Sequence, residues 1–229
     1  LIIQDVEEDL RAVSRLLAAF ERSRKPIVTG IFKENDFEMM KKVLLKYTDL
    51  SEKPTAIFDA CPNSPLHWSA HLSQSIIECA KNNVPTTILS MPMPLICSPP
   101  TFAGSLVQHT AENLSGIVLA ESAKPGAKVI YGGSPSLQAK TPLMSHPQTL
   151  KMILAYNRIG KYFKIPTHAY LGVSDSLMVD ERAFVESAYC LTKGKEAGIN
   201  VISGPGMLEG EKTQSILKLI FDSFICENS

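Results

Sequence analysis

Short apolar segments alternate with amphipathic helical segments along almost the whole chain, and this alternation constrains the fold more than any other feature. Strands are predicted at residues 27–30, 55–60, 86–90, 127–131, 167–171 and 199–202. Strands that are separated by helices run parallel, because each connection must cross back over the sheet. Their apolar residues do not alternate cleanly with polar ones, which is typical of strands buried on both faces. The sequence therefore predicts an α/β fold with a parallel sheet.

The predicted helices begin and end at recognisable residues. They span residues 2–22, 36–47, 67–82, 101–122, 150–163, 181–196 and 213–225. Lys25-Pro26 ends the first helix, because proline disfavours a helical residue before it. Two N-terminal caps are plausible for the helix that begins near Glu181: one is Asp175 or Ser176, and the other is Asp180.

Two architectures fit this alternation, an open doubly wound sheet and a closed (β/α)8 barrel. No G-x-G-x-x-G follows the first strand, which argues against a dinucleotide-binding sheet. The loops after the second to sixth strands are rich in Gly, Pro, Ser and Asp, and barrel active sites are built there. We predict a TIM-type (β/α)8 barrel over residues 1–229 as a single domain. Only six units are recognisable, so either two are obscure or the chain is part of a larger barrel protein.

The charge balance argues against a nucleic-acid partner. Lys plus Arg is 23 and Asp plus Glu is 23, whereas nucleic-acid binders usually show a basic surplus. No apolar run approaches the roughly 18 residues that span a bilayer, and no signal peptide is visible. The five cysteines include no C-x-x-C pair and fit a reducing compartment. We expect a cytoplasmic protein whose N-terminus lies upstream of Leu1.

One histidine pair raises the question of a metal site. His67 and His71 are spaced i, i+4, which places them on one helix face as in many zinc sites, and Cys61 could add a thiolate. The segment lacks the glutamate of H-E-x-x-H, and no obvious fourth ligand follows. We favour ordinary helix histidines and expect no metal, with a zinc site as the alternative.

Polar groups in and near the strand-end loops are candidate site residues. Residues 61–66 form a proline-rich loop that presents Asn63. Glu209 follows a glycine-rich turn and faces either a barrel mouth or solvent. Glu112 lies in the apolar stretch 106–119, where an unpaired carboxylate is costly. For Glu112 a capping or surface role is favoured over catalysis.

Several segments, read together, resemble one known family. They are CPNSPL (61–66), LVQHTAE (106–112), LSGIVLA (114–120), PGAKVIYGGSPS (125–136), SD (174–175) and GPGMLE (204–209). Their order and spacing resemble the trimethylamine methyltransferase family, which includes glycine betaine methyltransferases, over roughly residues 53–222. The resemblance implies a TIM barrel that transfers a methyl group from a methylamine or quaternary amine to cobalt. The cobalt belongs to a corrinoid (cobalamin) carried by a partner protein, so the resemblance implies no cofactor bound by this chain itself. Family members extend beyond both ends of this chain, which implies the central barrel portion of a longer protein.

The implied chemistry needs a dry pocket for a cation, because cob(I)alamin is a nucleophile that attacks a methyl carbon in line. Aromatic faces suit a quaternary ammonium through cation–π attraction. Phe58, Tyr131 and Tyr170 are the aromatic residues near strand ends.

The sequence departs from the family pattern at several polar positions. Val173 stands where trimethylamine-specific members place pyrrolysine, so the chain resembles the non-pyrrolysine branch, whose substrates are quaternary amines such as betaines. Ser203 replaces a His or Tyr. The other replacements are Leu177 for lysine, Gln148 for glutamate, Gln138 for aspartate and Lys140 for arginine.

The resemblance implies a corrinoid-dependent methyltransferase of one-carbon metabolism, such as methanogenesis. Its expected catalytic residues are Asp175 and Ser203, which orient the substrate, and Glu209, which supports them. The expected substrate-binding residues are Tyr131 and Val173 as pocket walls, with Asn63 and Glu112. The expected partners are a corrinoid protein and a small methylated amine, with neither nucleic acid nor membrane, and a homo-oligomer remains open. The alternatives are a barrel that has lost catalysis and acts as a binding or structural protein, and a zinc-dependent methyltransferase using Cys61, His67 and His71.

Overall fold

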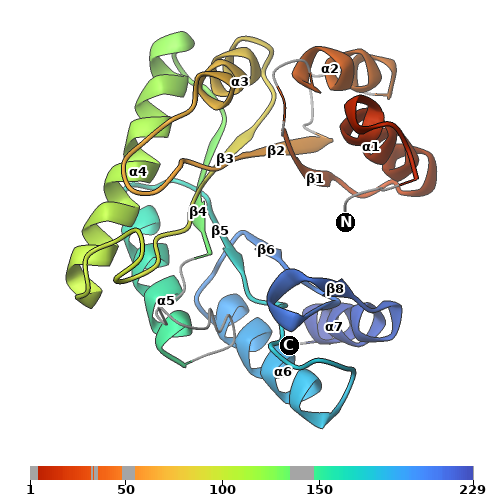
Figure 1. The fold of residues 1–229 in the computed structure, drawn as a ribbon, viewed down its shortest axis with the longest axis vertical. Coiled ribbons are helices and arrows are strands. Elements are labelled where there is room, and N and C mark those ends of the chain that lie inside the picture. Colours follow the sequence, from red (N-terminus) through yellow and green to blue (C-terminus); the bar gives the residue numbers. More distant parts are fainter. Residues whose placement is uncertain (1–4, 32, 34–35, 48–54, 135–146, 229) are drawn as a thin grey trace. The chain divides into compact units, whose positions relative to one another are not determined.

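The computed structural model describes residues 5–31, 33, 36–47, 55–134 and 147–228 (Figure 1). Gln138 and Lys140 lie outside this part of the chain. The chain divides into two compact units. The first comprises Leu1–Asn63, His67–Leu89 and Leu114–Ile130, and the second comprises Ser64–Leu66, Ser90–Asn113 and Tyr131–Ser229.

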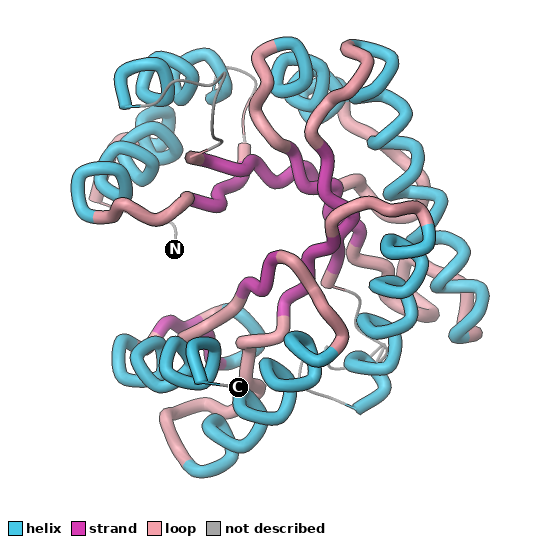
Figure 2. Tube along the Cα trace, turned by 180° about the vertical axis from the view of Figure 1, so that it is seen from behind, coloured by secondary structure: helices cyan, strands magenta, loops and turns pink. Residues whose placement is uncertain are grey.

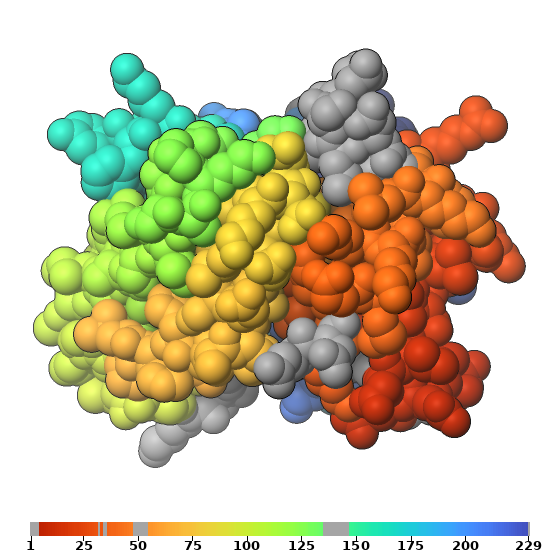
Figure 3. All heavy atoms as spheres, turned by 90° about the horizontal axis from the view of Figure 1, so that it is seen from above, coloured from red at the N-terminus to blue at the C-terminus, as the bar shows by residue number. Residues whose placement is uncertain are grey.

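The first unit is built on parallel strands, β1 (Ile27–Gly30), β2 (Ala56–Ala60) and most of β3 (Thr86–Ser90). Its helices are α1 (Arg11–Arg22), preceded by a 3-10 turn at Glu8–Leu10, then α2 (Asp36–Tyr47) and α3 (Ala70–Lys81). They lie on one side of the strands (Figure 2). Leu16 of α1, Met40 of α2 and Phe58 of β2 are fully buried in one apolar cluster. Figure 3 shows α1 and α2, in red and orange, lying next to one another.

The second unit repeats this plan. Most of β4 (Val129–Gly133) pairs in parallel with β5 (Thr167–Tyr170), which pairs in parallel with β6 (Val201–Ser203). Its helices are α5 (Pro147–Tyr162), α6 (Glu181–Glu196), α7 (Ile216–Asn228) and the first half of α4 (Phe102–Ala123). A small antiparallel pair, β7 (Met207–Leu208) and β8 (Thr213–Gln214), flanks a 3-10 turn at Glu209–Glu211 and precedes α7.

The side chains of β5 alternate between a face that points toward the helices and an opposite face. The Thr167 hydroxyl donates to Asn157 of α5 at 2.6 Å, so this side chain points toward the helices. His168 and Tyr170 lie on the opposite face, where their rings meet edge to face with centroids 5.3 Å apart. The alternation follows from the period of two along a strand.

The expected fold class is confirmed, because six parallel β/α units follow one another among the described residues. The single-domain assignment stays a prediction. Among the described helices, none is long and apolar enough to cross a membrane. Most expected boundaries agree with the structure to within a few residues.

Four details of the sequence prediction need correction. Strand β4 runs through Gly132 and Gly133 rather than ending before them. The third helix begins at Ala70 and not at residue 67, since the backbones of Asn63 and His67 exchange two hydrogen bonds in a turn. The last helix begins at Ile216 and not at residue 213, because Thr213–Gln214 pairs with Met207–Leu208. The first helix begins at Arg11, after the 3-10 turn at Glu8–Leu10, and not at residue 2. Of the two caps left open for α6, Asp180 is confirmed, because its carboxylate accepts from the Ala183 N–H at 2.8 Å.

Candidate functional site

The loops that follow β5 and β6 are in direct backbone contact. The N–H groups of Leu171 and Gly172 both donate to the Ser203 carbonyl at 3.1 Å. A Cβ atom on Gly172 would lie 2.3 Å from the Pro205 nitrogen, so only glycine allows this approach. Val173 is buried against the other loop, since a Cβ on Gly204 would lie 2.7 Å from its Cγ2. The structure therefore brings the loop that carries Val173 against the end of β6, where Ser203 lies, and substrate contact by either residue stays a prediction.

A buried ion pair on α7 forms hydrogen bonds with the backbone of both loops. Lys218 Nζ lies 2.6 Å from Asp222 Oδ2, and both side chains are fully buried. Lys218 Nζ also donates to the Gly172 carbonyl at 2.7 Å, and the Gly206 N–H donates to Asp222 Oδ2 at 2.7 Å. Each charge is thus hydrogen-bonded to one of the two loops as well as to its partner. Sequence reasoning missed this pair, although its i, i+4 spacing in an apolar helix was a usable signal.

Ser203 is paired with a histidine on the neighbouring strand. Ser203 Oγ lies 2.7 Å from Nε2 of His168, which is fully buried. Burial lowers the pKa of His168 to about 4, so the imidazole is neutral at pH 7. In the parallel register of β5 and β6, Ser203 stands opposite Tyr170. Sequence reasoning missed His168, whose only signal was a titratable residue within a buried strand.

Asp175 is positioned through its backbone by a carboxylate on α6. Its N–H donates to Glu186 Oε2 at 3.1 Å, and the Ser174 hydroxyl donates to the same oxygen at 2.6 Å. Burial raises the pKa of Glu186, but the hydrogen bonds from Ser174 and Arg182 outweigh it and leave the pKa below its usual value. The Asp175 side chain is half-buried. Glu186 therefore fixes the loop that carries Asp175.

Glu209 lies beside the same loop. Its N–H donates to the Ser176 carbonyl at 3.0 Å, and the Ser174 N–H donates to the Met207 carbonyl at 3.0 Å. The Glu209 carboxylate accepts a short hydrogen bond from the Thr213 hydroxyl. Backbone hydrogen bonds thus link the loop that carries Val173 and Asp175 to the end of β6 at Ser203 and to the 3-10 turn at Glu209.

Tyr131 lies on the helix-facing side of β4. It is fully buried, and its hydroxyl donates to Thr110 of α4 at 3.0 Å. Its ring belongs to an aromatic cluster with His109 and Tyr156, and burial raises its pKa to about 12. A Cβ on Gly133 would lie 2.3 Å from His109 Nε2, so the close approach of α4 to β4 requires the glycine. These contacts are those of a core residue, and substrate contact at Tyr131 stays a prediction.

Glu112 is only 1% exposed, so the surface interpretation of this residue is wrong. Its carboxylate accepts hydrogen bonds from the Leu66 N–H at 2.9 Å and the Ser64 hydroxyl at 2.8 Å, and a short one from Ser90. Gln108, one turn earlier on α4, donates to it at 2.9 Å. These donors replace the water that burial removes. Glu112 thus holds the loop at residues 64–66 and the end of β3, and substrate contact by its carboxylate stays a prediction.

The candidate residues of the first unit form no comparable cluster. Asn63 is exposed, its backbone closes the turn with His67, and substrate contact at Asn63 stays a prediction. Within the residues that the structure describes, no group of three or more His, Cys, Asp or Glu side chains is placed to hold a metal ion. Cys61, His67 and His71 therefore do not form such a group.

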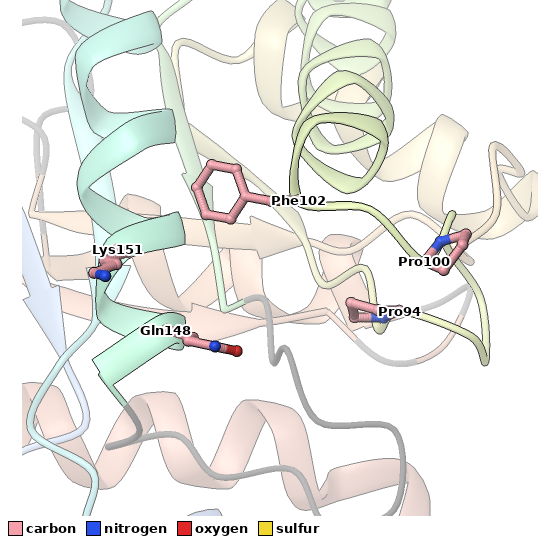
Figure 4. A pocket seen from close by; sticks show the side chains of 5 residues that line it. All are labelled: Pro94, Pro100, Phe102, Gln148 and Lys151. Carbon is pink, nitrogen blue, oxygen red and sulfur yellow. The ribbon is translucent and has the colours of Figure 1, made fainter.

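A cavity of about 300 Å³ opens beside the start of α5 in the second unit. Its lining consists of Pro94, Pro100, Phe102, Gln148 and Lys151 (Figure 4). The ring of Phe102 extends from the start of α4 toward α5, which carries Gln148 and Lys151. Of the family departures noted above, Gln148 lines this cavity, whereas Leu177 is 75% exposed. None of the predicted site residues is among these five lining residues.

Comparison with known proteins supports the resemblance. Trimethylamine methyltransferase MttB from Methanosarcina barkeri is 37% identical over 177 residues, covering 76% of this chain and 36% of the relative. A proline betaine:corrinoid methyltransferase from Eubacterium limosum is 26% identical over 199 residues, covering 85% of this chain and 41% of the relative. The chain thus spans less than half the length of these curated relatives.

Solved structures show the same fold at low sequence identity. The 7,8-dihydropteroate synthase from Vibrio fischeri ES114 superimposes with a TM-score of 0.57 at 17% identity, over 99% of this chain and 77% of that chain.

The model of the family described as trimethylamine methyltransferase (MTTB) matches residues 3–229. The chain therefore belongs to the trimethylamine methyltransferase (MTTB) family.

Proposed function

We propose that this chain forms the substrate-binding part of a corrinoid-dependent methyltransferase. In this proposal a methyl group passes from a betaine-like quaternary amine, or a methylamine, to the cobalt of a corrinoid on a partner protein. The observation that carries it is the joining of two strand-end loops that present Val173, Asp175, Ser203 and Glu209. Family membership supplies the reaction class. A cytoplasmic location is part of the proposal, and the free cysteines are consistent with it.

Each of these residues has a proposed task. The Asp175 carboxylate supplies negative charge near the substrate ammonium, which stabilises the bound cation. Ser203 orients the substrate by a hydrogen bond, while Val173 provides an apolar wall. Glu209 supports the loop of Asp175 through its backbone bond to Ser176. The corrinoid is the acceptor substrate and supplies the nucleophile, so the tasks of these residues are to bind, orient and exclude water.

Val173 supports a quaternary amine over trimethylamine as the methyl donor. A valine side chain offers neither a nucleophile nor an electrophile, so the pocket acts by binding and orientation alone. The proline betaine:corrinoid methyltransferase among the relatives favours the same substrate class. The zwitterionic members of this class carry an ammonium and a carboxylate, and the residues above include groups suited to both.

Loss of the cob(I)alamin absorbance band under anaerobic conditions tests the proposal. The chain is mixed with a corrinoid acceptor and a panel of methylamines and betaines. We expect methylation with one betaine and not with trimethylamine. Asp175→Asn should abolish the reaction, while Glu227→Gln on the exposed end of α7 should not. No reaction with any compound, from protein shown to be folded, would favour a barrel that has lost catalysis.

A further inference from the structure

Three side chains share the face of β5 and β6 that points away from α5. His168 and Tyr170 alternate with Thr167, which points toward α5. Ser203 lies on the same face as His168, since its hydroxyl contacts the His168 ring at 2.7 Å. The register of the two strands places Ser203 opposite Tyr170. An aromatic ring, a hydroxyl and an imidazole therefore lie side by side on one face.

The hydrogen bonds of His168 determine which way the Ser203 hydroxyl points. A neutral imidazole has one N–H, on either Nδ1 or Nε2. Nδ1 of His168 is buried and has no hydrogen-bond partner among the described residues, whereas Nε2 contacts Ser203. A buried N–H without a partner is rarer than an unpaired acceptor. The proton therefore belongs on Nε2, where it is donated to Ser203 Oγ.

This assignment makes the Ser203 hydroxyl a donor to a group other than His168. The Ser203 oxygen already accepts from His168, so its own proton must be directed elsewhere. Ser203 is only partly buried, so a ligand can reach this proton. A neutral His168 also places no positive charge beside a bound ammonium, which a protonated ring would repel.

We propose that Ser203, held by His168, forms a donor subsite that binds a carboxylate oxygen of the substrate beside the ring of Tyr170. This inference rests on the proposed function and deepens it, because it selects amines that carry a carboxylate. The ring of Tyr170 suits the ammonium group and Ser203 suits the anionic end of the same molecule. His168 is a positioning residue that acts through Ser203. An amine without an acceptor oxygen would leave the hydroxyl unpaired and bind less well.

The first test reads the tautomer of His168 directly. In ¹⁵N-labelled chain, the side-chain nitrogen shifts of His168 distinguish the Nε2–H form, the Nδ1–H form and the imidazolium. We expect the Nε2–H form from pH 6 to pH 8. The Nδ1–H form or an imidazolium at pH 7 would overturn the proposal, and this measurement needs neither corrinoid nor turnover.

The second test measures ligand binding by calorimetry. The probes are glycine betaine and tetramethylammonium, which share the quaternary ammonium group but differ in the carboxylate. We expect tighter binding of glycine betaine, and Ser203→Ala should weaken it about 10- to 100-fold while leaving tetramethylammonium unchanged. Ser122→Ala, on the exposed face of α4, is the matched control and should change neither.

The outcomes separate this subsite from the proposed function. The subsite would be overturned if Ser203→Ala weakened the binding of both ligands equally or of neither. It would also be overturned if glycine betaine showed no measurable binding. Carboxylate-dependent binding without any methyl transfer would support the subsite and count against the proposed function.

Discussion

Replacing Lys218 by methionine tests whether the buried ion pair holds the two site loops. Methionine has a similar length and no charge, so it leaves the carboxylate of Asp222 fully buried without its cation. Breaking one partner of such a pair costs about 3–5 kcal/mol, because an uncompensated charge remains in the interior. The Gly172 carbonyl also loses its donor, which adds about 1–3 kcal/mol where no water replaces it. We expect the free energy of unfolding to fall by at least about 3 kcal/mol.

The double variant Lys218→Met with Asp222→Leu separates charge from packing. Because it removes both charges, only the Gly172 carbonyl and the Gly206 N–H lose partners. The double variant should therefore be more stable than Lys218→Met alone, although it carries more changes.

Urea unfolding followed by far-ultraviolet circular dichroism gives the free energies, since this signal covers the helices of both units. Lys193→Met, which removes one partner of an exposed pair with Glu196, is the control and should change little. A loss below about 1 kcal/mol in Lys218→Met, or a double variant that is no more stable than Lys218→Met, would refute the reasoning.

Three further predictions follow from the described contacts. Glu112→Ala removes the acceptor of several buried donors and should lower the free energy of unfolding by about 2–4 kcal/mol in urea; a change below about 0.5 kcal/mol would contradict this role. Gly133→Ala should lower the free energy of unfolding by about 1–3 kcal/mol, because its Cβ would overlap His109; an unchanged midpoint in thermal unfolding would refute the close approach. Burial raises the pKa of Asp59 to about 7, despite the nearby Arg15, so between about pH 4 and pH 7 the folded chain binds more protons than the unfolded chain. Stability should therefore fall as pH rises through this window and should do so less in Asp59→Asn, and equal slopes in the two titrations would exclude the effect.

The elements of the fold are readable from the sequence because their signals are local. Short apolar segments, prolines before strands and helical periodicity all act within a few residues of the element they define. The errors arise where a contact with a residue distant in the sequence determines where an element begins or ends. Gly133 stays in β4 because it pairs with Ala169 of β5, and Thr213 joins a strand because it pairs with Leu208. No local pattern contains that information.

The face on which a strand residue lies was harder to predict than the strand itself. Tyr131 and Tyr170 both stand near strand ends, yet Tyr131 packs against α4 while Tyr170 lies on the face of β5 opposite α5. Strands that are apolar on both faces lack the alternation that would assign each face. Only the partners, Thr110 for one tyrosine and His168 for the other, separate the two cases.

Ionisable side chains on three helices support different loops in the same way. Glu112 of α4 holds the loop at residues 64–66, Glu186 of α6 holds Ser174 and Asp175, and the Lys218–Asp222 pair of α7 holds Gly172 and Gly206. In each case a loop backbone group bonds to the charged side chain, so the ion replaces water that the loop would otherwise need.

This common arrangement suggests an interpretation for an ionisable residue within an apolar helix segment. Such a residue can support a strand-end loop, and in the proposed function the residues that meet the substrate are those that the loop carries. The two roles have different signatures. Asp175→Ala should remove binding or methyl transfer with little loss of stability, because its backbone bond to Glu186 remains. Glu186→Ala should lower stability and function together, because it frees the Ser174 hydroxyl and the Asp175 N–H at once.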